Sequence, residues 1–343
     1  MNMNRVKKRL VISFFILIST IWAASASAAT YDRMVVFGDS LSDHYGLHTY
    51  LGPILGDYDA VTNPGGIREV WTNGDVWAEY LAEFWNAELD NRAIAGAMTQ
   101  GHDTPAVQAL VDQGVLPPLG MTGQVSTWLD EAALPLSGDT LFVIWVGGND
   151  LLVYGEGRSE AATAEEMISD AVTNVTAALG QLYDAGARKF LVMNLPDLGT
   201  IPYCLSQSAD VQAATTELTE NFNTALYEAV EAFAESENDE TLHWFDVFTF
   251  LHRVVEIGVF PNTTDTYLVL DEDGNDTGEV NEPAWAYLYW DTVHPTTRTH
   301  KLLGHFVGFR LYFDSGIGNH PRCYSNGTYS FMKSQLEYLA AEN

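Results

Sequence analysis

The sequence predicts an α/β protein in which helices cover a mostly parallel sheet. Short runs that are apolar throughout alternate along the chain with longer segments of helical periodicity. Strands that are apolar on both faces are buried on both faces, which is typical of parallel sheets. Helices of crossover length between such strands then cover the sheet. No repeat and no Pro- or Ser-rich linker interrupts the pattern, which predicts one domain.

The order of the predicted elements follows from these runs. Four apolar runs predict strands at residues 33–37, 140–146, 189–195 and 242–248. Amphipathic segments predict helices at residues 74–85, 163–187, 210–237 and 298–313. The remaining irregular stretches are predicted to be surface loops, at residues 45–75, 100–125 and 258–290.

The first 28 residues have the pattern of a secretory signal. A basic start without acids precedes an apolar stretch at residues 11–24, and Ala-Ser-Ala at 26–28 has the spacing of a cleavage site. The apolar stretch is too short for a typical membrane span, and an uncleaved anchor is the alternative. The sequence therefore predicts a secreted or periplasmic protein, with a domain at 29–313 and a C-terminal extension at 314–343 packed on it.

The composition bounds the partners of the chain. Its formal net charge is −30, and loss of the four basic residues of the leader would make it −34. Such a charge repels nucleic acid, so no nucleic-acid partner is expected. No later stretch reaches 18 apolar residues, so no stable membrane insertion of the mature chain is expected. The mature chain is expected to be a monomer.

Two cysteines, Cys204 and Cys323, are the whole thiol content of the chain. Export permits a disulfide between them, and we expect them to pair, with two free thiols as the alternative. Neither has a His or Asp at a spacing that suggests zinc.

The acidic stretch at 271–282 partly resembles a calcium-binding loop, but Asp276 stands where that loop needs glycine, so a solvated hairpin is the favoured interpretation. No cofactor and no metal are expected.

The first predicted strand ends in Gly38-Asp39-Ser40, which raises the possibility of a nucleophile. The segment is either an ordinary turn or a tight strand-to-helix bend that carries Ser40 at a helix start, where the helix field favours a developing anion. In open α/β sheets chemistry collects at the carboxyl ends of the strands. A serine nucleophile needs an imidazole base, and the imidazole needs a carboxylate partner.

The segment YWDTVHPTT, at residues 289–297, offers both partners. Asp291 and His294 are three residues apart, so on one turn of chain they lie side by side. Pro295 limits how a helix could continue through the histidine. Such Asp-x-x-His pairs also arise often by chance, so this motif alone is weak.

Attack on an ester also needs donors for the oxygen that becomes negative. The segment WVGGND at 145–150 follows a predicted strand and offers the side-chain amide of Asn149, although a turn is the simpler interpretation of it. The segment NRAIAGA at 91–97 offers the backbone N–H of Gly96. The N–H of Ser40 is a third candidate donor.

Together, these segments resemble a known family. FGDSLSD, NRAIAGA, VGGND and DTVHP are similar, in order, to the four motif blocks of the GDSL, or SGNH, serine hydrolases. The resemblance implies that Ser40 is the nucleophile, that Asp291 and His294 complete a triad, and that Gly96 and Asn149 join the Ser40 N–H in the oxyanion hole. It also implies a flavodoxin-like three-layer α/β/α fold with a parallel sheet of about five strands. Two departures are His44-Tyr45 before Gly46 and Ala95 before Gly96.

The resemblance implies acyl transfer and leaves the acyl group open. The secreted branch of the family that this chain resembles acts on lipids, so an esterase or lipase for phospholipid, lysophospholipid or short- to medium-chain acyl esters is expected. The alternatives are a polysaccharide acetylesterase, a glycerophospholipid acyltransferase and a non-enzymatic secreted binding module on the same fold. Several aromatic residues could line an acyl groove or belong to the core: Tyr45, Tyr50, Tyr58, Trp71, Trp77 and Tyr80.

Overall fold

The computed structural model describes residues 31–55, 71–136, 138–237, 242–271 and 276–313. The predicted signal at 1–28 and the predicted extension at 314–343 lie outside these ranges, so both stay predictions. Within the described ranges, no helix combines the length and the hydropathy that crossing a bilayer requires.

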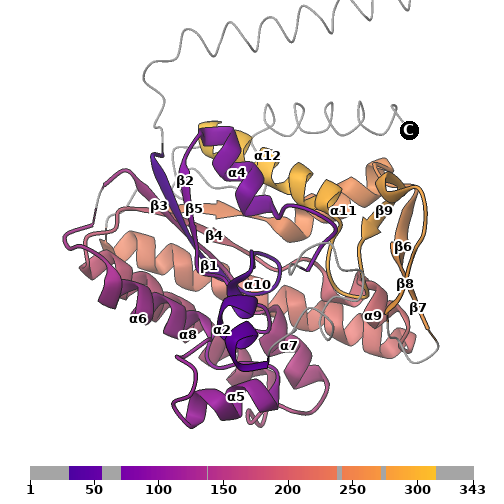
Figure 1. The fold of residues 1–343 in the computed structure, drawn as a ribbon, viewed down its shortest axis with the longest axis horizontal. Coiled ribbons are helices and arrows are strands. Elements are labelled where there is room, and N and C mark those ends of the chain that lie inside the picture. Colours follow the sequence, from indigo (N-terminus) through magenta and orange to yellow (C-terminus); the bar gives the residue numbers. More distant parts are fainter. Residues whose placement is uncertain (1–30, 56–70, 137, 238–241, 272–275, 314–343) are drawn as a thin grey trace, which may run out of the picture. The chain divides into compact units, whose positions relative to one another are not determined.

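A parallel five-stranded sheet forms the centre of the described domain (Figure 1). Its strands pair in the order β2-β1-β3-β4-β5, and every pairing is parallel. The strands are β1 (Arg33–Gly38), β2 (Glu88–Asn91), β3 (Thr140–Trp145), β4 (Lys189–Met193) and β5 (Leu242–Phe245). Parallel strands end at a common edge, so the residues that follow β1 and β3 meet there. The predicted α/β class and the sheet of about five strands are confirmed.

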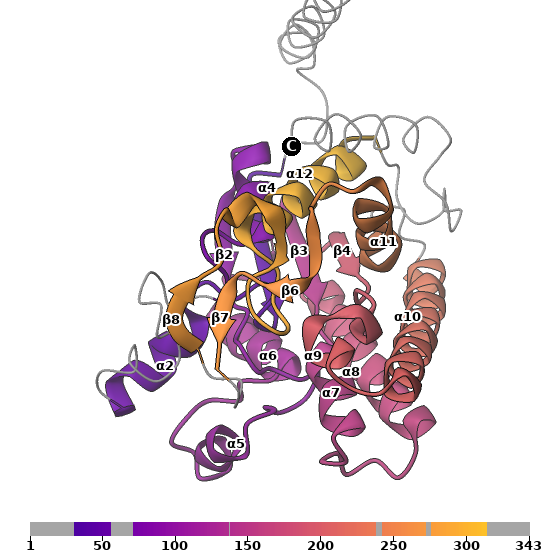
Figure 2. The same cartoon turned by 90° about the vertical axis from the view of Figure 1, so that its right-hand side faces the viewer.

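Helices cover both faces of this sheet (Figures 1 and 2). One face carries α4 (Trp77–Trp85), α11 (Val247–Ile257) and α12 (Thr297–Phe313). The other face carries α6 (Met121–Glu131), α8 (Ala164–Asp184) and α10 (Ala209–Glu237). The packing of α4 on α12 and of α8 on α10 closes the two outer layers. The three-layer arrangement expected from the motif blocks is therefore present.

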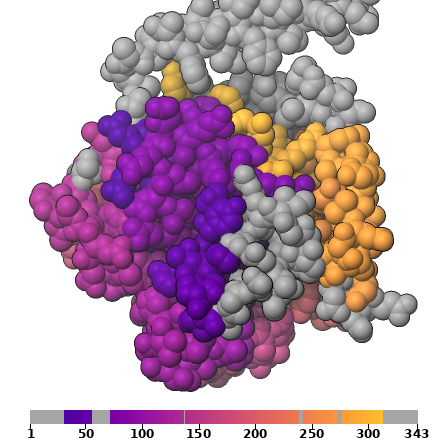
Figure 3. All heavy atoms as spheres, in the orientation of Figure 1, coloured from indigo at the N-terminus to yellow at the C-terminus, as the bar shows by residue number. Residues whose placement is uncertain are grey.

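The remaining elements connect the layers. The helices are α2 (Gly46–Leu55), α5 (Pro105–Asp112), α7 (Gly148–Gly155), α9 (Pro202–Leu205), η1 (Leu198–Thr200) and η2 (Ala284–Ala286). Two small sheets pair β6 (Asn262–Thr266) with β9 (Tyr287–Tyr289), and β7 (Leu268–Leu270) with β8 (Asp276–Val280). In the space-filling view the orange segments that include β6 to β9 lie on the right, apart from the purple segments of α5 (Figure 3).

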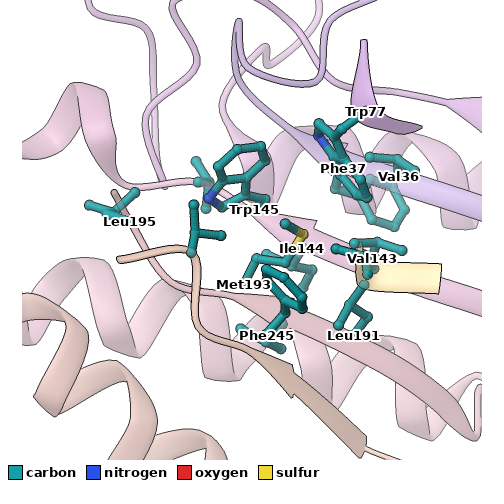
Figure 4. Packing of buried hydrophobic residues seen from close by; sticks show 14 of the residues in the cluster. Val36, Phe37, Trp77, Val143, Ile144, Trp145, Leu191, Met193, Leu195 and Phe245 are labelled. Carbon is teal, nitrogen blue, oxygen red and sulfur yellow. The ribbon is translucent and has the colours of Figure 1, made fainter. Parts of the chain in front are cut away.

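The core is built from both faces of the sheet (Figure 4). Val36 and Phe37 of β1, Trp145 of β3 and Phe245 of β5 are all at most 2% exposed. Trp77 of α4 meets Trp145 edge to face, with ring centroids 5.7 Å apart. Aromatic pairs in this geometry contribute about 0.5–1.5 kcal/mol beyond the area they bury. This contact anchors the outer helix layer directly beneath the carboxyl edge of the sheet.

The structure corrects several predicted boundaries. The predicted strand at 242–248 ends at Phe245, because the side chain of Asp246 accepts the Thr249 N–H at 3.0 Å and caps α11. The predicted loops at 45–75, 100–125 and 258–290 contain α2, α5, the start of α6, and β6 to β9. Strand β2 has the sequence ELDN, which lacks the apolar run used to find strands. It forms at the sheet edge because β1 supplies its hydrogen bonds.

Candidate active site

Ser40 lies just past the carboxyl end of β1 and is 8% exposed. The carbonyl of Asp39 accepts the N–H groups of Ser42 and Asp43, both at 3.0 Å, which closes a tight turn around Ser40. The predicted helix start at Ser40 is wrong, because the next helix, α2, begins only at Gly46. A helix field therefore does not act on Ser40, and the turn itself presents the hydroxyl.

Gly38 lets this turn form next to β3. A Cβ at Gly38 would stand 2.4 Å from the carbonyl oxygen of Trp145, a distance that no side chain tolerates. The side-chain amide of Gln124 holds both backbone groups of Gly38: it accepts the N–H at 3.0 Å and donates to the carbonyl at 2.8 Å. Gln124 was missed in the sequence, because a lone glutamine on a helix carries no motif.

The structure brings Ser40, His294 and Asp291 together. The Ser40 Oγ lies 2.8 Å from His294 Nε2, and His294 Nδ1 lies 2.7 Å from Asp291 Oδ2. Because Asp291 accepts the proton on Nδ1, Nε2 is the acceptor for the serine hydroxyl. The predicted juxtaposition of Asp291 and His294 on one turn is therefore observed.

Asp291 is held as a carboxylate in a largely buried position. Its Oδ1 accepts the backbone N–H groups of Val293 and His294, at 2.8 and 2.6 Å. Burial opposes ionisation, but the field of His294 and these hydrogen bonds together hold the pKa of Asp291 below its usual value. The group is therefore ionised wherever a neutral imidazole could act as a base.

Segments from elsewhere in the chain fix the loop that carries His294. The Thr72 hydroxyl donates to the Pro295 carbonyl at 2.9 Å, and the Asn73 side chain accepts the Thr297 N–H at 2.8 Å. The Trp71 ring lies 5.1 Å from the His294 ring, tilted by 36°. Of the aromatic residues considered for an acyl groove, Trp77 belongs to the core, Trp71 contacts His294, and Tyr58 lies outside the described residues.

Gly96 occupies a position where the backbone conformation and the neighbouring residues leave no room for a side chain. Its φ is +78°, and a Cβ would lie 2.4 Å from the His102 ring. Asp43 draws the neighbouring Ala95 to the Ser40 turn, because its carboxylate accepts the Ala95 N–H at 2.6 Å as well as the N–H of Gly46. Burial raises the pKa of Asp43 to about 6 despite these bonds.

Two backbone donors near Ser40 stay open. Among the described residues, no hydrogen bond uses the N–H of Ser40 or of Gly96. Ser40 is buried and Gly96 is half-buried, and an N–H group in such a place that has no protein partner is free to bind a ligand. Open donors beside a candidate nucleophile are what binding of a negative oxygen requires.

His102, which was missed in the sequence, fixes one of these donors. Its Nδ1 accepts the Thr104 N–H at 3.1 Å, so Nε2 carries the proton and donates to the Ala95 carbonyl at 2.9 Å. The peptide unit from Ala95 to Gly96 is planar, so holding its carbonyl also sets the direction of the Gly96 N–H. No sequence motif marks His102, which simply follows Gly101 in a stretch predicted to be a loop.

Replacement of His102 by alanine is expected to lower kcat by about tenfold to a hundredfold with little change in KM, because a loosened Gly96 N–H stabilises the transition state less well. His102→Gln keeps a side-chain donor and should recover part of the rate. Steady-state kinetics of both variants, with melting temperatures to check folding, make the measurement. A change confined to the melting temperature would leave His102 a purely structural residue.

Asn149 is the second residue of α7 and faces the same loop. Its amide donates to the Ala97 carbonyl at 2.9 Å, which leaves its second amide hydrogen available. The adjacent Asp150 accepts both the N–H and the hydroxyl of Thr99, at 2.9 and 2.7 Å. Burial raises the pKa of Asp150 to about 6. These bonds tie the start of α7 to the segment that carries Gly96.

Of the two glycines before Asn149, only Gly147 is demanded by the structure. Its φ is +121°, and a Cβ would lie 2.6 Å from the Phe222 ring. Next along α10, Asn223 clamps the Leu195 backbone by accepting its N–H and donating to its carbonyl, both at 2.9 Å. The Phe222-Asn223 pair therefore holds the loops after β3 and β4 in place.

Asp39 faces a small cavity beside Ser40. Its Oδ1 accepts the Leu41 N–H at 3.0 Å, so it holds the turn and caps no helix. Burial raises the pKa of Asp39 to about 7. His300 lines the same cavity, and burial lowers its pKa to about 3. Both groups are therefore close to neutral in a mildly acidic medium.

Two predictions from the sequence concern other positions. Cys204 is buried in α9, whereas Cys323 lies outside the described residues, so their pairing stays a prediction. The acidic stretch at 271–282 contributes to the antiparallel pair of β7 and β8, which is the favoured hairpin. Its turn at 272–275 is not described. In the described parts of the chain, no three His, Cys, Asp or Glu side chains lie together as metal ligands would.

Several known proteins are similar in sequence to this chain. Thermolabile hemolysin from Vibrio parahaemolyticus is 27% identical over 307 residues, covering 82% of this chain and 65% of that protein. Phosphatidylcholine-sterol acyltransferase from Aeromonas hydrophila is 29% identical, covering 61% of this chain and 57% of that protein. An acetylesterase from Thermothelomyces thermophilus is 25% identical, and the match covers 80% of this chain and 86% of that protein. The chain spans less than two-thirds of the length of the first two relatives.

A family model extends over nearly the whole described domain. The model described as GDSL-like Lipase/Acylhydrolase matches residues 34–307. The match begins in β1, just before Ser40, and ends in α12, beyond His294, so it includes every segment that meets at the site. The chain therefore belongs to the GDSL-like lipase/acylhydrolase family.

Proposed function

We propose that the protein is a secreted carboxylic ester hydrolase for lipid-like acyl esters, with Ser40 as nucleophile, His294 as base and Asp291 as the partner of His294. One observation carries this proposal: the unbroken contact from the Ser40 Oγ through the imidazole to the Asp291 carboxylate, at 2.8 and 2.7 Å. A serine hydroxyl is a weak nucleophile until such a base can take its proton.

In the first half of the reaction, the Ser40 Oγ attacks the carbonyl carbon of the ester while its proton passes to His294 Nε2. The negative oxygen that forms is bound by the N–H groups of Ser40 and Gly96 and by the Asn149 amide. Asp291 stabilises the imidazolium. The C–O bond to the leaving alcohol then breaks, His294 returns its proton to that alcohol, and the acyl group stays on Ser40.

In the second half, water takes the place of the alcohol. His294 Nε2 removes a proton from the water as its oxygen attacks the acyl carbon. Collapse of the intermediate breaks the bond to Ser40, whose oxygen recovers the proton, and releases a carboxylic acid. Where an alcohol attacks in place of water, the same steps transfer the acyl group to it, so product analysis separates hydrolysis from acyl transfer.

The lipid-like substrate class and the extracytoplasmic location have separate support. One relative is named for phosphatidylcholine and sterol, which are both lipids. The leader at residues 1–28 has the charge and hydropathy of a secretory signal. We propose that the exported chain acts as a monomer without inserting in a membrane and without nucleic-acid or metal partners.

The test is hydrolysis of p-nitrophenyl esters and of lysophosphatidylcholine by the purified mature chain. The proposal expects turnover of at least one substrate and its loss in Ser40→Ala. Turnover that Ser40→Ala retains would contradict it. A protein that takes no label from a fluorophosphonate probe would favour a binding module on the same fold.

A second candidate function is removal of acetyl groups from a polysaccharide. The small size of the cavity beside Ser40, about 40 Å³, favours it, and so does the acetylesterase among the relatives. Acetylated xylan and lysophosphatidylcholine, assayed side by side, separate the two candidates. Activity on the polysaccharide alone would replace the lipid-like substrate class and leave the roles of Ser40 and His294 in place.

Asn149→Ala is expected to slow turnover by about 10²- to 10³-fold, because one donor to the negative oxygen is lost. Asn174→Ala is the matched control, since this amide binds the Thr99 hydroxyl at 3.2 Å within the same network and does not line the cavity beside Ser40. Its rate should stay within about threefold of wild type. Equal rates for both variants and the wild type would remove Asn149 from the site.

A further inference from the structure

Two neighbouring cavities, one of them beside the candidate nucleophile, share part of their lining. The first, here called the Ser40 cavity, has a volume of about 40 Å³ and includes Ser40 and Asn149 in its lining. The second, here called the His252 cavity, has a volume of about 240 Å³ and includes His252 and Val255 in its lining. The two linings have three residues in common, Pro196, Leu251 and Tyr289. These three residues form the wall between the cavities.

The Ser40 cavity is suited to an apolar group attached to the ester carbonyl. Besides Ser40 and Asn149, much of its lining is aliphatic: Leu152, Leu198, Ile201, Leu251 and Leu303. Because Ser40 and Asn149 both belong to this lining, an ester carbonyl bound between them would have one of its substituents beside the aliphatic residues. Other polar residues in the lining of the Ser40 cavity are Asp39, Thr299 and His300.

The volume of this cavity limits its occupant. A dry apolar cavity of about 150 Å³ holds a benzene molecule, and a single water needs about 10–15 Å³. At about 40 Å³ the Ser40 cavity takes a group of very few carbon atoms. The His252 cavity exceeds the benzene-sized volume, so it would hold a chain of six to eight carbons if the wall were open.

Leu251 is the wall residue that can be shortened without breaking a polar contact. The Tyr289 phenol is hydrogen-bonded to Thr200, and Pro196 belongs to the backbone path that leaves β4. Leu251 is 8% exposed, lies on α11 and contributes only aliphatic atoms. Its removal would join the two cavities and leave the Ser40 turn in place.

We propose that the acyl group of the substrate enters the Ser40 cavity and that Leu251 is the stop that sets its maximum length. The proposal rests on the proposed ester hydrolysis and narrows its substrates to short acyl chains. The competing occupant of the cavity is water. His300 makes this a real alternative, because its Nε2 is buried without a hydrogen-bond partner in the described part of the chain.

The experiment compares kcat/KM for p-nitrophenyl acetate, butyrate and octanoate. In Leu251→Ala the ratio of kcat/KM for octanoate to kcat/KM for butyrate is expected to rise by about tenfold or more. The reason is that each methylene group that newly packs in an apolar pocket raises kcat/KM by roughly that factor. Leu251→Val removes one carbon, folds more readily, and should give a smaller rise in the same direction. Because Leu251 itself lines the Ser40 cavity, the acetate rate of each variant serves only to normalise the rates with the longer esters.

Leu205→Ala is the matched control. Leu205 lines the His252 cavity and not the Ser40 cavity, so its truncation enlarges the former without touching the wall. This variant should keep the wild-type ratio. An equal rise in Leu205→Ala and Leu251→Ala would contradict the role of Leu251 as the stop.

A binding measurement separates the failure of this proposal from the failure of ester hydrolysis. In the Ser40→Ala background, titration with octanoate is expected to give at least tenfold tighter binding when Leu251→Ala is added. If Ser40-dependent hydrolysis is present but the chain-length ratio and the octanoate affinity stay at wild-type values, water occupies the cavity and the proposal is wrong. If hydrolysis does not depend on Ser40, the proposed function fails, and the affinity of the double variant still decides whether the wall limits chain length.

Discussion

Replacement of Ser40 by alanine is expected to lower kcat for ester hydrolysis by about 10⁴- to 10⁶-fold, the range for loss of the nucleophile from a serine triad. Within the described residues, the Ser40 Oγ is the hydrogen-bond partner of His294 Nε2, at 2.8 Å, so the variant removes the group that this base would deprotonate. His294→Ala should cost a similar factor, and the double variant little more, because the two residues act as one unit.

Ser42→Ala is the matched control for Ser40→Ala. Ser42 stands two residues away in the same turn and is fully buried, and its Oγ accepts the Trp77 indole N–H at 3.0 Å. Loss of this bond should lower the free energy of unfolding by about 1 kcal/mol and leave kcat within about threefold of wild type. A large loss of activity in Ser42→Ala, without unfolding, would show that the turn and not the Ser40 hydroxyl limits the reaction.

Asp291→Asn is expected to lower kcat by about 10⁴-fold, although it changes a single atom type. Oδ1 accepts two backbone N–H groups, so an asparagine must keep its oxygen there and turn its amide toward His294 Nδ1. Nδ1 then has to accept, and the imidazole proton moves to Nε2. An imidazole with a proton on Nε2 cannot take one from Ser40.

A second Asp–His pair provides the control for Asp291→Asn. Asp197 Oδ2 lies 3.1 Å from His252 Nε2, outside the Ser40 site. Asp197→Asn should change the melting temperature, because the Asp197 carboxylate also accepts the Thr216 hydroxyl and the Gly199 N–H, and it should leave kcat within about threefold of wild type. Steady-state kinetics of the two variants make the comparison. Equal losses in both would contradict a special role for Asp291.

Sequence patterns predict those parts of the fold whose cause is local. The runs at β1, β3 and β4 have no polar side chain after their first residue, so their strands and the parallel sheet could be predicted. Strand β2 could not, because three of its four residues are polar and its pairing depends on β1, more than fifty residues earlier. The small sheet of β6 and β9 likewise forms only through a partner distant in sequence.

The same distinction holds for the candidate site. Ser40, Asp291 and His294 lie in short motifs, and the structure brings these three into contact. Gly96 and Asn149 also lie in short motifs, and their oxyanion roles stay predictions. His102 and Gln124 were not predicted, because each acts on the backbone of another segment and only the folded chain brings the two together. The proposed role of Leu251 could not be predicted either, since an apolar residue on a helix normally indicates only a place in the core.

The proposed hydrolysis depends on one hydroxyl acting as the nucleophile, and covalent labelling tests this most directly. The mature chain is treated with a fluorophosphonate probe, digested, and examined by peptide mass spectrometry. We expect one adduct, on the peptide that contains Ser40, formed at least 10³-fold more slowly in His294→Ala. An adduct on any other residue, or an equal rate in His294→Ala, would contradict the account.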